Sequence, residues 1–265
     1  MIGNEVYNVD AGSVVARGIS HDDSELIAAF AGPIKAIITD SDGKHRIEGF
    51  LTNLATSEFQ TAAIAEIIEN SSALTSHRLG EAIAESFLIE TSNCEFPFPM
   101  ARDQRNPNAN AAGADLVGFV SHAGSFRFAF GEVKTSSDES CPPQVMYGQG
   151  GLKQQLEGLR DDRKVSNALV RYLSHKYASS VVNSTKFESA ASRYLSNHRD
   201  ITIYGVMVRD VAPNSIDLAT RAKSLHKDCP NHIGIELKAL YFSAPISEMV
   251  ALFHRSTAQD NLNVN

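Results

Sequence analysis

The stretch from Gly113 to Ser136, GADLVGFVSHAGSFRFAFGEVKTS, decides the fold that this sequence predicts. Two apolar runs flank the short segment 122–125, His-Ala-Gly-Ser, a pattern typical of a β-hairpin. The runs also carry charged residues at their outer ends, where an ordinary core strand would have none: Asp115, Glu132 and Lys134. We therefore expect the chemistry of the protein to lie on this hairpin.

The hairpin also predicts which residues face each other. If the four residues 122–125 form a symmetric loop, Ser121 pairs with Phe126. Counting outward along an antiparallel ladder then places Asp115 directly opposite Glu132. The sequence therefore predicts that these two carboxylates are neighbours.

Side chains alternate along a strand, so Glu132 and Lys134 share one face with Asp115. The rest of that face is apolar and consists of Val117, Phe119, Phe128 and Phe130. The opposite face is also apolar and contains Leu116, Val120, Ala129 and Val133. Apolar residues on both faces indicate a central pair of strands that is covered on both sides, with Arg127 near the tip as the exception.

Charged groups in such a place need a partner. Two carboxylates within about 5 Å repel each other and lose hydration, so they stay ionised near neutral pH only when a cation lies between them. Oxygen ligands favour Mg²⁺ or Mn²⁺. Lys134 would then orient or deprotonate the attacking water. The alternative is that Glu132 and Lys134 form a solvated ion pair, which is common for an E-x-K pair on an exposed strand.

These residues resemble the signature of the PD-(D/E)xK nuclease superfamily, with Asp115 as its Asp and Glu132-Val133-Lys134 as its (D/E)xK. Ala114 stands where the signature has proline, a position that varies in the superfamily. The resemblance implies that Asp115, Glu132 and Lys134 are catalytic. It also implies a further acidic ligand on the preceding helix, often in a Gly-Glu pair, so that Glu81, Asp115 and Glu132 would bind Mg²⁺ or Mn²⁺.

The wider run 77–151, with RLGEAIAESF, GADLVGF and GEVKTS in this order, resembles the nuclease subunit of Hachiman-type antiphage defence systems. That resemblance implies an α/β, restriction-endonuclease-like fold with a mixed β-sheet flanked by helices. It also implies a deoxyribonuclease that acts on DNA beside a helicase subunit encoded nearby. The alternative is a nuclease-like fold that regulates a helicase without cutting.

The helix that would supply the further ligand is predicted over residues 76–90 by its apolar periodicity. Glu81 and Glu85 lie four residues apart on a common flank, so only one of them needs to face the metal. The Gly-Glu pair favours Glu81, with Glu85 in reserve. By the same resemblance, Gln149 or Gln154 would support the site from the helix after the catalytic strand, or they are ordinary surface glutamines.

The charge balance is unfavourable for binding DNA. The 265 residues include 24 Lys and Arg against 31 Asp and Glu, a net charge of -7, whereas duplex affinity comes mainly from neutralised phosphates. Either positive residues are focused locally or a partner holds the DNA. Arg102, Arg105 and Lys153 are possible DNA contacts, and further basic residues near the expected site are Arg78, Arg160, Arg163 and Lys164.

The sequence divides into an N-terminal elaboration or docking region over 1–54, a nuclease-like domain over 55–255 and a polar tail over 256–265. Within the first region we expect a strand at 34–39 and a turn at 40–43. A helix over 56–70 should pack its apolar face into the core.

Downstream of the hairpin, helices are expected over 162–178, 186–197 and 247–254, with strands over 201–208 and 233–242. Cys94, Cys141 and Cys229 are odd in number and far apart, which indicates reduced thiols. The chain shows no signal peptide and no apolar run near 18 residues, so a soluble, cytoplasmic protein with no membrane contact is expected.

Overall fold

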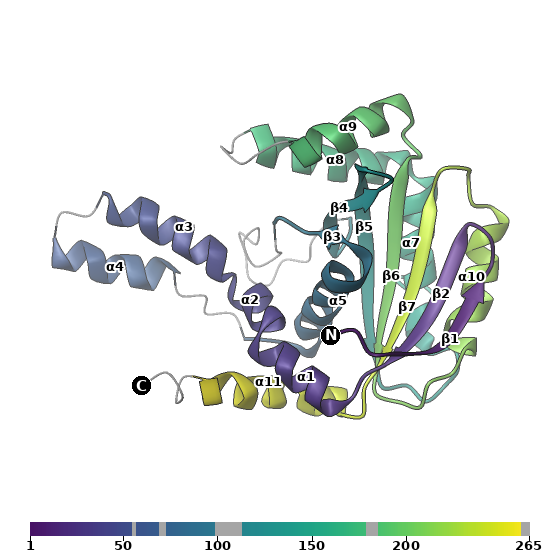
Figure 1. Ribbon diagram of the computed structural model, residues 1–265, viewed down its shortest axis with the longest axis horizontal. Helices are drawn as coiled ribbons and strands as arrows, with labels where there is room; N and C mark the ends of the chain where they lie inside the picture. The colour runs from purple at the N-terminus through teal and green to yellow at the C-terminus, as the bar shows by residue number, and fades with distance from the viewer. Residues whose placement is uncertain (55–56, 69–72, 99–112, 179–184, 261–265) are drawn as a thin grey trace.

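A seven-stranded mixed β-sheet forms the centre of the protein, with helices on both of its faces (Figure 1). The computed structural model describes residues 1–54, 57–68, 73–98, 113–178 and 185–260. The sheet has the order β1-β2-β7-β6-β5-β4-β3. The predicted α/β class with a mixed sheet flanked by helices is confirmed, and the arrangement is compatible with a restriction-endonuclease-like fold.

The strands of this sheet come from both halves of the chain. They are β1 (Asn4–Asp10), β2 (Val14–Ser20), β3 (Cys94–Glu95), β4 (Leu116–His122), β5 (Ser125–Ser136), β6 (Ile201–Arg209) and β7 (Gly234–Tyr241). Strands β2, β7, β6 and β5 run parallel to one another, while β1, β4 and β3 pair antiparallel. Every residue of β6 is buried, as expected for a parallel strand covered on both faces.

Two separate hydrophobic cores lie on the two faces of the sheet. One core contains side chains of α1 (Asp23–Ala31), α2 (Pro33–Thr39), α5 (Ser76–Ser92) and α11 (Ile246–Asp260). The other contains side chains of α7 (Leu152–Asp161), α8 (Arg163–Ala178), α9 (Thr185–Ser196) and α10 (Ile216–Lys227). A short 3₁₀ helix, η1 (Gln144–Met146), precedes α7. The helices and strands predicted downstream of the hairpin are confirmed, and α10 is an addition.

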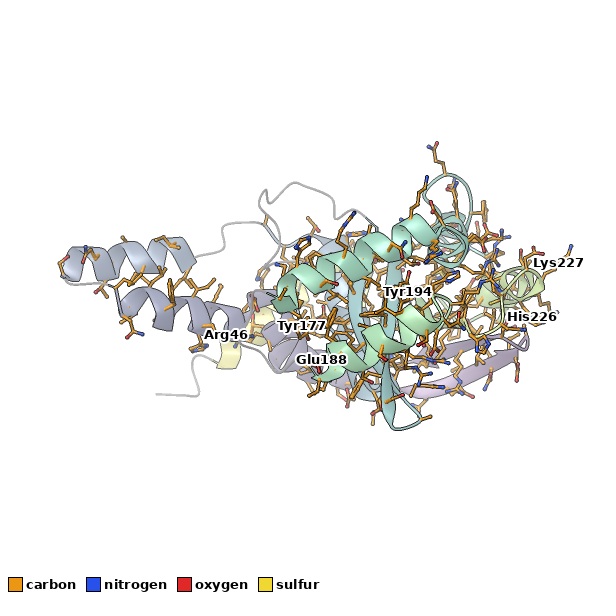
Figure 2. The ribbon with its side chains drawn as sticks, turned by 90° about the horizontal axis from the view of Figure 1, so that it is seen from above. Arg46, Tyr177, Glu188, Tyr194, His226 and Lys227 are labelled. Atoms are coloured by element: carbon orange, nitrogen blue, oxygen red, sulfur yellow. The ribbon has the colours of Figure 1, made fainter. Side chains whose placement is uncertain are left out.

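Helices α3 (Ser41–Thr52) and α4 (Glu58–Ile68) pack against each other and extend away from the sheet as an arm (Figure 1). Arg46 of α3 is labelled on the arm in the view from above (Figure 2). The helix expected over 56–70 is confirmed as α4. Its expected packing in the core is wrong for Ile67, whose side chain is 66% exposed.

The N-terminal residues form part of the central sheet, and two local expectations for them are wrong. β1 and β2 belong to the same sheet as the hairpin, because β2 pairs with β7 along its whole length. The strand expected at 34–39 is the helix α2, which begins with Pro33 in its first turn, a position where proline favours a helix. The turn expected at 40–43 is instead the start of α3, where the side chain of Asp40 accepts a hydrogen bond from the Gly43 N–H.

Three smaller expectations can also be compared with the structure. Cys94, Cys141 and Cys229 are free, as predicted. Helix α11 continues to Asp260, so the first residues of the expected polar tail are helical. Within the described residues, no helix is both long enough and apolar enough to cross a membrane.

Candidate functional site

The β4–β5 hairpin has the predicted register. Ser121 pairs with Phe126, and the ladder continues to Leu116 opposite Gly131. The turn is tighter than expected, because His122 and Ser125 also pair with each other. The loop therefore consists of Ala123 and Gly124 alone, and both residues have positive φ angles. The register is unchanged, since a symmetric shortening of the loop does not shift the pairing.

Asp115 is held against β5 by two backbone contacts. Its N–H donates to the carbonyl of Gly131 at 2.9 Å, and its Oδ2 accepts a hydrogen bond from the Val133 N–H at 2.8 Å. The Asp115 carboxylate therefore lies beside Glu132, as the register predicts. The two faces of the hairpin also separate as expected, with Phe119, Phe128 and Phe130 in one core and Val133 in the other.

Glu132 is the most strongly perturbed carboxyl group of the hairpin. Its side chain is buried, and its Oε2 has no hydrogen-bond partner among the described residues. Burial, together with the neighbouring Asp115 carboxylate, raises the pKa of Glu132 to about 8, although the positive charge of Lys134 opposes this rise. Burial also raises the pKa of Asp115. The pair therefore lacks enough positive charge to keep both groups ionised at neutral pH.

Helix α5 approaches this pair closely because of a glycine. A Cβ atom added to Gly80 would lie 2.3 Å from Oγ1 of Thr135 on β5, which no ordinary contact allows. The absence of a side chain at Gly80 thus lets the helix pack against the strand. Glu81 follows directly, and its side chain is buried.

The carboxylate of Glu81 already has two basic neighbours on its own helix. His77 Nδ1 lies 2.9 Å from Oε1, and Arg78 Nη1 donates to Oε2 at 3.0 Å. Burial alone would raise the pKa of Glu81, but His77 and Arg78 outweigh it and lower the pKa. His77 was not among the residues predicted to lie at the site. Its i, i+4 spacing from Glu81 is the signal that would have found it.

Glu85, the reserve ligand, lies one turn further along α5. It is 3% exposed, and burial raises its pKa to about 7. The charge of Arg78 opposes this rise, whereas the charge of Glu81 adds to it. Glu85 therefore differs from Glu81 in protonation near neutral pH, although the two residues belong to one helix.

The supporting glutamines are only partly as expected. Gln149 lies in the turn before α7 rather than on a helix. Gln154 is on α7 but exposed, and its Oε1 accepts a hydrogen bond from the Gly150 N–H at 2.8 Å. Gln155 has a buried Oε1 with no partner among the described residues. Its spacing from the buried Leu152 and Leu159 would have predicted that it faces the sheet.

The structure describes one of the three expected DNA contacts, Lys153. Lys153 forms an ion pair with Glu157 on the same helix. Arg102 and Arg105 lie outside the described residues. Arg78, one of the further basic residues, pairs with Glu81 as described above.

The hairpin offers oxygen ligands that suit a divalent cation, but these ligands are not arranged as a preformed metal site. In the described part of the chain, no three His, Cys, Asp or Glu side chains are arranged to hold a metal ion. Glu132 Oε2 nevertheless is a buried oxygen without a partner, next to a second carboxylate, and oxygen ligands suit Mg²⁺ and Mn²⁺. Neither a scan against protein-family models nor a search of curated proteins found a match to this chain.

Proposed function

We propose that the protein is a metal-dependent deoxyribonuclease of the PD-(D/E)xK type, which hydrolyses phosphodiester bonds in antiphage defence together with a helicase partner. The observation that carries the proposal is the pair Asp115 and Glu132, two carboxylates forced together by the hairpin with Lys134 on the same face. A structural role gives no reason to bury this excess of negative charge.

The residues have distinct roles in this proposal. Asp115 and Glu132 would hold Mg²⁺ or Mn²⁺, with Glu81 as the third ligand. When bound, the cation would neutralise charge on the phosphate and lower the pKa of the attacking water. Lys134 would hold that water in line with the scissile bond, and Gln155 would position the site from α7.

A second function is favoured by a specific observation. Both oxygens of Glu81 are paired with His77 and Arg78, so Glu81 would have to give up a partner to bind a metal. A site that has lost its catalytic function, in a subunit that regulates a helicase without cutting, would show this arrangement. Binding of Mn²⁺ discriminates between the two functions, because a site without catalytic function should not bind the cation.

The first experiment measures cleavage of single- and double-stranded DNA with Mg²⁺ at about 0.15 M salt, where charges are screened beyond roughly 8 Å. The net charge of -7 predicts that the isolated chain binds DNA weakly and cuts poorly, and that the helicase partner increases cleavage. Rapid cleavage by the isolated chain would remove the partner requirement. No cleavage with or without the helicase would favour the regulatory function.

The second experiment tests the residues. Asp115→Ala, Glu132→Ala and Lys134→Ala should each reduce cleavage by about a thousandfold or more, since each removes a group that acts on the reacting phosphate. Glu139→Ala is the matched control, because it removes an exposed carboxylate from the loop that follows β5. Full activity of Glu132→Ala would exclude this site.

A further inference from the structure

A cleft of about 140 Å³ lies at the amino end of β6, away from the carboxylate pair. Arg160, Arg163, His198 and Arg199 contribute to its walls, and Tyr194 lies on its inner side. Ile201, where β6 begins, pairs with Phe128, whereas Glu132 of the carboxylate pair is opposite Gly205. Four residues of strand therefore separate the two places, which corresponds to roughly 13 Å.

The charge of the cleft is opposite to that of the chain. Three arginines face a single acidic residue, Asp161, in a protein with a net charge of -7. These arginines come from the end of α7, the start of α8 and the loop before β6. Only the fold brings them together. A positively charged cleft on an acidic protein concentrates positive electrostatic potential at one place and so attracts anions there.

Arg160 and Asp161 neutralise each other and form a rigid wall. Arg160 donates from Nε and Nη2 to the two oxygens of Asp161, at 2.7 and 2.6 Å, and from Nη1 to the carbonyl of Leu225 at 2.7 Å. Its side chain is 5% exposed. The acidic residue of the cleft is thus already paired, and the remaining positive charge belongs to Arg163 and Arg199.

Arg163 and Arg199 are the groups available to a ligand. Both are exposed, and neither side chain has a recorded ion pair or hydrogen bond within the described residues. The amino end of α8 begins at Arg163, but the Asp162 side chain already accepts the Lys164 N–H at 2.8 Å. An anion would therefore be held mainly by the two guanidinium groups.

Tyr194, another residue that lines the cleft, is also anchored. It belongs to α9 and lies on the side of α9 that faces α8 (Figure 2), and its hydroxyl donates to Asn167 Oδ1 of α8 at 2.8 Å. The volume of the cleft is well below the roughly 300 Å³ at which pockets for drug-sized ligands begin. The space therefore suits one compact anionic group and excludes a whole nucleotide.

We propose that this cleft binds a single phosphate group through Arg163 and Arg199. The group is either a free or terminal phosphate or a phosphodiester in the backbone of a nucleic-acid strand. A nucleic-acid strand as the source rests on the proposed function, since the cleft would hold DNA roughly four base pairs from the carboxylate pair. Binding of phosphate itself does not depend on nuclease activity.

Binding is measured on the full chain in EDTA, which prevents cleavage. The probes are inorganic phosphate by calorimetry, and a single-stranded oligonucleotide with a 5′-phosphate or a 5′-hydroxyl by fluorescence anisotropy. Preference for the 5′-phosphate, with binding of inorganic phosphate, assigns the cleft to a terminal phosphate. Equal binding of the two oligonucleotides, lost with the arginines, assigns it to the backbone.

Arg163→Gln and Arg199→Gln should each weaken binding about tenfold or more, because each removes a charge-assisted contact. Lys164→Gln removes the same charge from the next residue, which is exposed and outside the cleft, and should retain nearly full affinity. The proposal is overturned if none of the probes binds at up to about 10 mM, or if the Lys164 variant loses as much affinity as the arginine variants. Melting temperatures verify that each variant is folded.

Discussion

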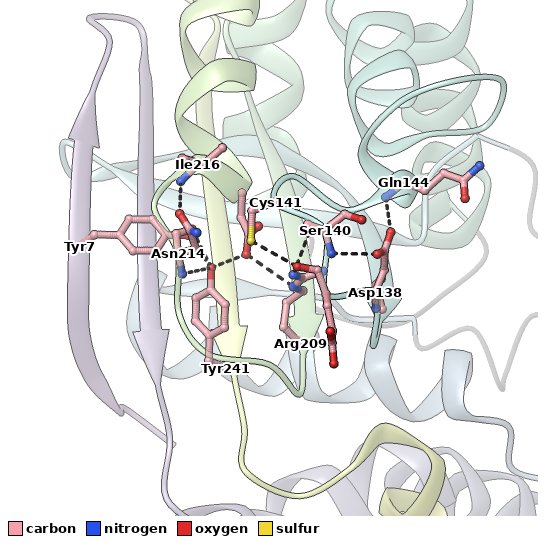
Figure 3. Close-up of polar contacts among 12 residues, drawn as sticks. Tyr7, Asp138, Ser140, Cys141, Gln144, Arg209, Asn214, Ile216 and Tyr241 are labelled. Atoms are coloured by element: carbon pink, nitrogen blue, oxygen red, sulfur yellow. Dashed lines mark hydrogen bonds and ion pairs between the residues drawn. The ribbon is translucent and has the colours of Figure 1, made fainter.

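Two buried charged clusters lie toward the carboxyl ends of neighbouring parallel strands, and they differ in how their charges are balanced. On β5, Glu132 lies beside Asp115 with an unpartnered oxygen and a pKa raised to about 8 by burial. On β6 and β7, Arg209 and Tyr241 surround Asp217 of α10 (Figure 3). The first cluster has an excess of one sign, whereas the second combines both signs.

The second cluster is tied together by contacts between distant segments. Arg209 Nε lies 3.4 Å from Asp217 Oδ2, and the Tyr241 hydroxyl donates to the same oxygen at 2.7 Å. Tyr7 on β1 lies within hydrogen-bond distance of Tyr241, at 2.9 Å between the two hydroxyl oxygens. Arg209 also donates from Nη2 to the carbonyl of Ser140 at 3.3 Å. This cluster joins β1, β6, β7 and α10, as Figure 3 shows.

The comparison separates a structural cluster from a functional candidate. A buried charge whose partner is inside the protein stabilises one arrangement of the chain, and removing the partner is costly. A buried carboxyl pair without a counter-charge is itself a cost, and carboxyl groups perturbed in this way concentrate at functional sites. The pair Asp115 and Glu132 is of this second kind, which makes it the functional candidate.

The largest effect on stability should come from the balanced cluster. Asp217→Ala leaves Arg209, which is fully buried, without its counter-charge and should reduce the free energy of unfolding by about 3–5 kcal/mol. Urea denaturation measures this loss. The double variant Arg209→Met with Asp217→Leu should recover much of it, because it removes both charges. A loss under about 1 kcal/mol for Asp217→Ala would contradict the structural role.

The matched substitution in the cluster of Asp115 and Glu132 should leave the free energy of unfolding unchanged or increase it. Glu132→Gln removes a carboxyl group that burial keeps partly protonated, so the metal-free variant should be as stable as the wild type or more stable. Thermal denaturation in EDTA at pH 8 measures the difference. Adding Mn²⁺ should then raise the melting temperature of the wild type but not of the variant. A marked destabilisation by Glu132→Gln would place this residue in the structural class.

The same cluster should make stability depend on pH. The pKa of Glu132 is higher in the folded protein, about 8, than its ordinary value of 4.5, so the folded state binds more protons between these values. Its contribution is fully present below pH 4.5 and is lost as the pH rises through 8. Glu85 acts in the same direction, with a pKa of about 7. In EDTA, unfolding free energy should fall between pH 5 and 8, by on the order of 2 kcal/mol.

Glu132→Gln is the control for this pH dependence, because it removes the group with the larger shift. Urea denaturation of the wild type and the variant at several pH values should give a shallower slope for the variant. Equal slopes would show that other groups cause the pH dependence.

Glu81 and Glu85 offer a smaller contrast within one helix. Glu81→Gln should reduce cleavage more than Glu85→Gln, since His77 and Arg78 lower the pKa of Glu81 and keep it ionised, although it must give up one of these partners to bind a metal. Cleavage rates at saturating Mg²⁺ measure the ranking. The reverse ranking would assign the helix ligand to Glu85 without changing the class of enzyme.

Gly80→Ala should have the smallest effect. The added Cβ would lie too close to Thr135 Oγ1, so Thr135 must shift or α5 must move away from β5. We expect a loss of about 1 kcal/mol in stability together with slower cleavage. The double variant Gly80→Ala with Thr135→Ala makes room for the methyl group and should recover both. A cost that persists in the double variant would show that Gly80 is needed for its backbone rather than for close packing.

Much of the candidate site was predictable from the sequence. The pairing of Asp115 with Glu132 follows from counting along a short hairpin, whose register depends on nearby residues only. The helix that carries Glu81 follows from its apolar period, and the structure adds an N-cap at Thr75. Neither His77 nor Gln155 was predicted to lie at the site, because only the apolar residues of their helices were used. The spacing of each residue along its helix nevertheless indicates which face of the helix it occupies.

What the sequence determined by itself is local: the hairpin register, the two apolar faces and the longer helices, since each depends on residues within a few positions of one another. Only the tertiary structure decided the rest. The segment 34–39 is a helix because it packs beside α1 and α5, although its composition suits a strand. Two groups of residues come together only when the sheet brings distant segments side by side: Arg209, Asp217 and Tyr7, and likewise Arg160, Arg163 and Arg199. Such contacts cannot be predicted from a local sequence pattern.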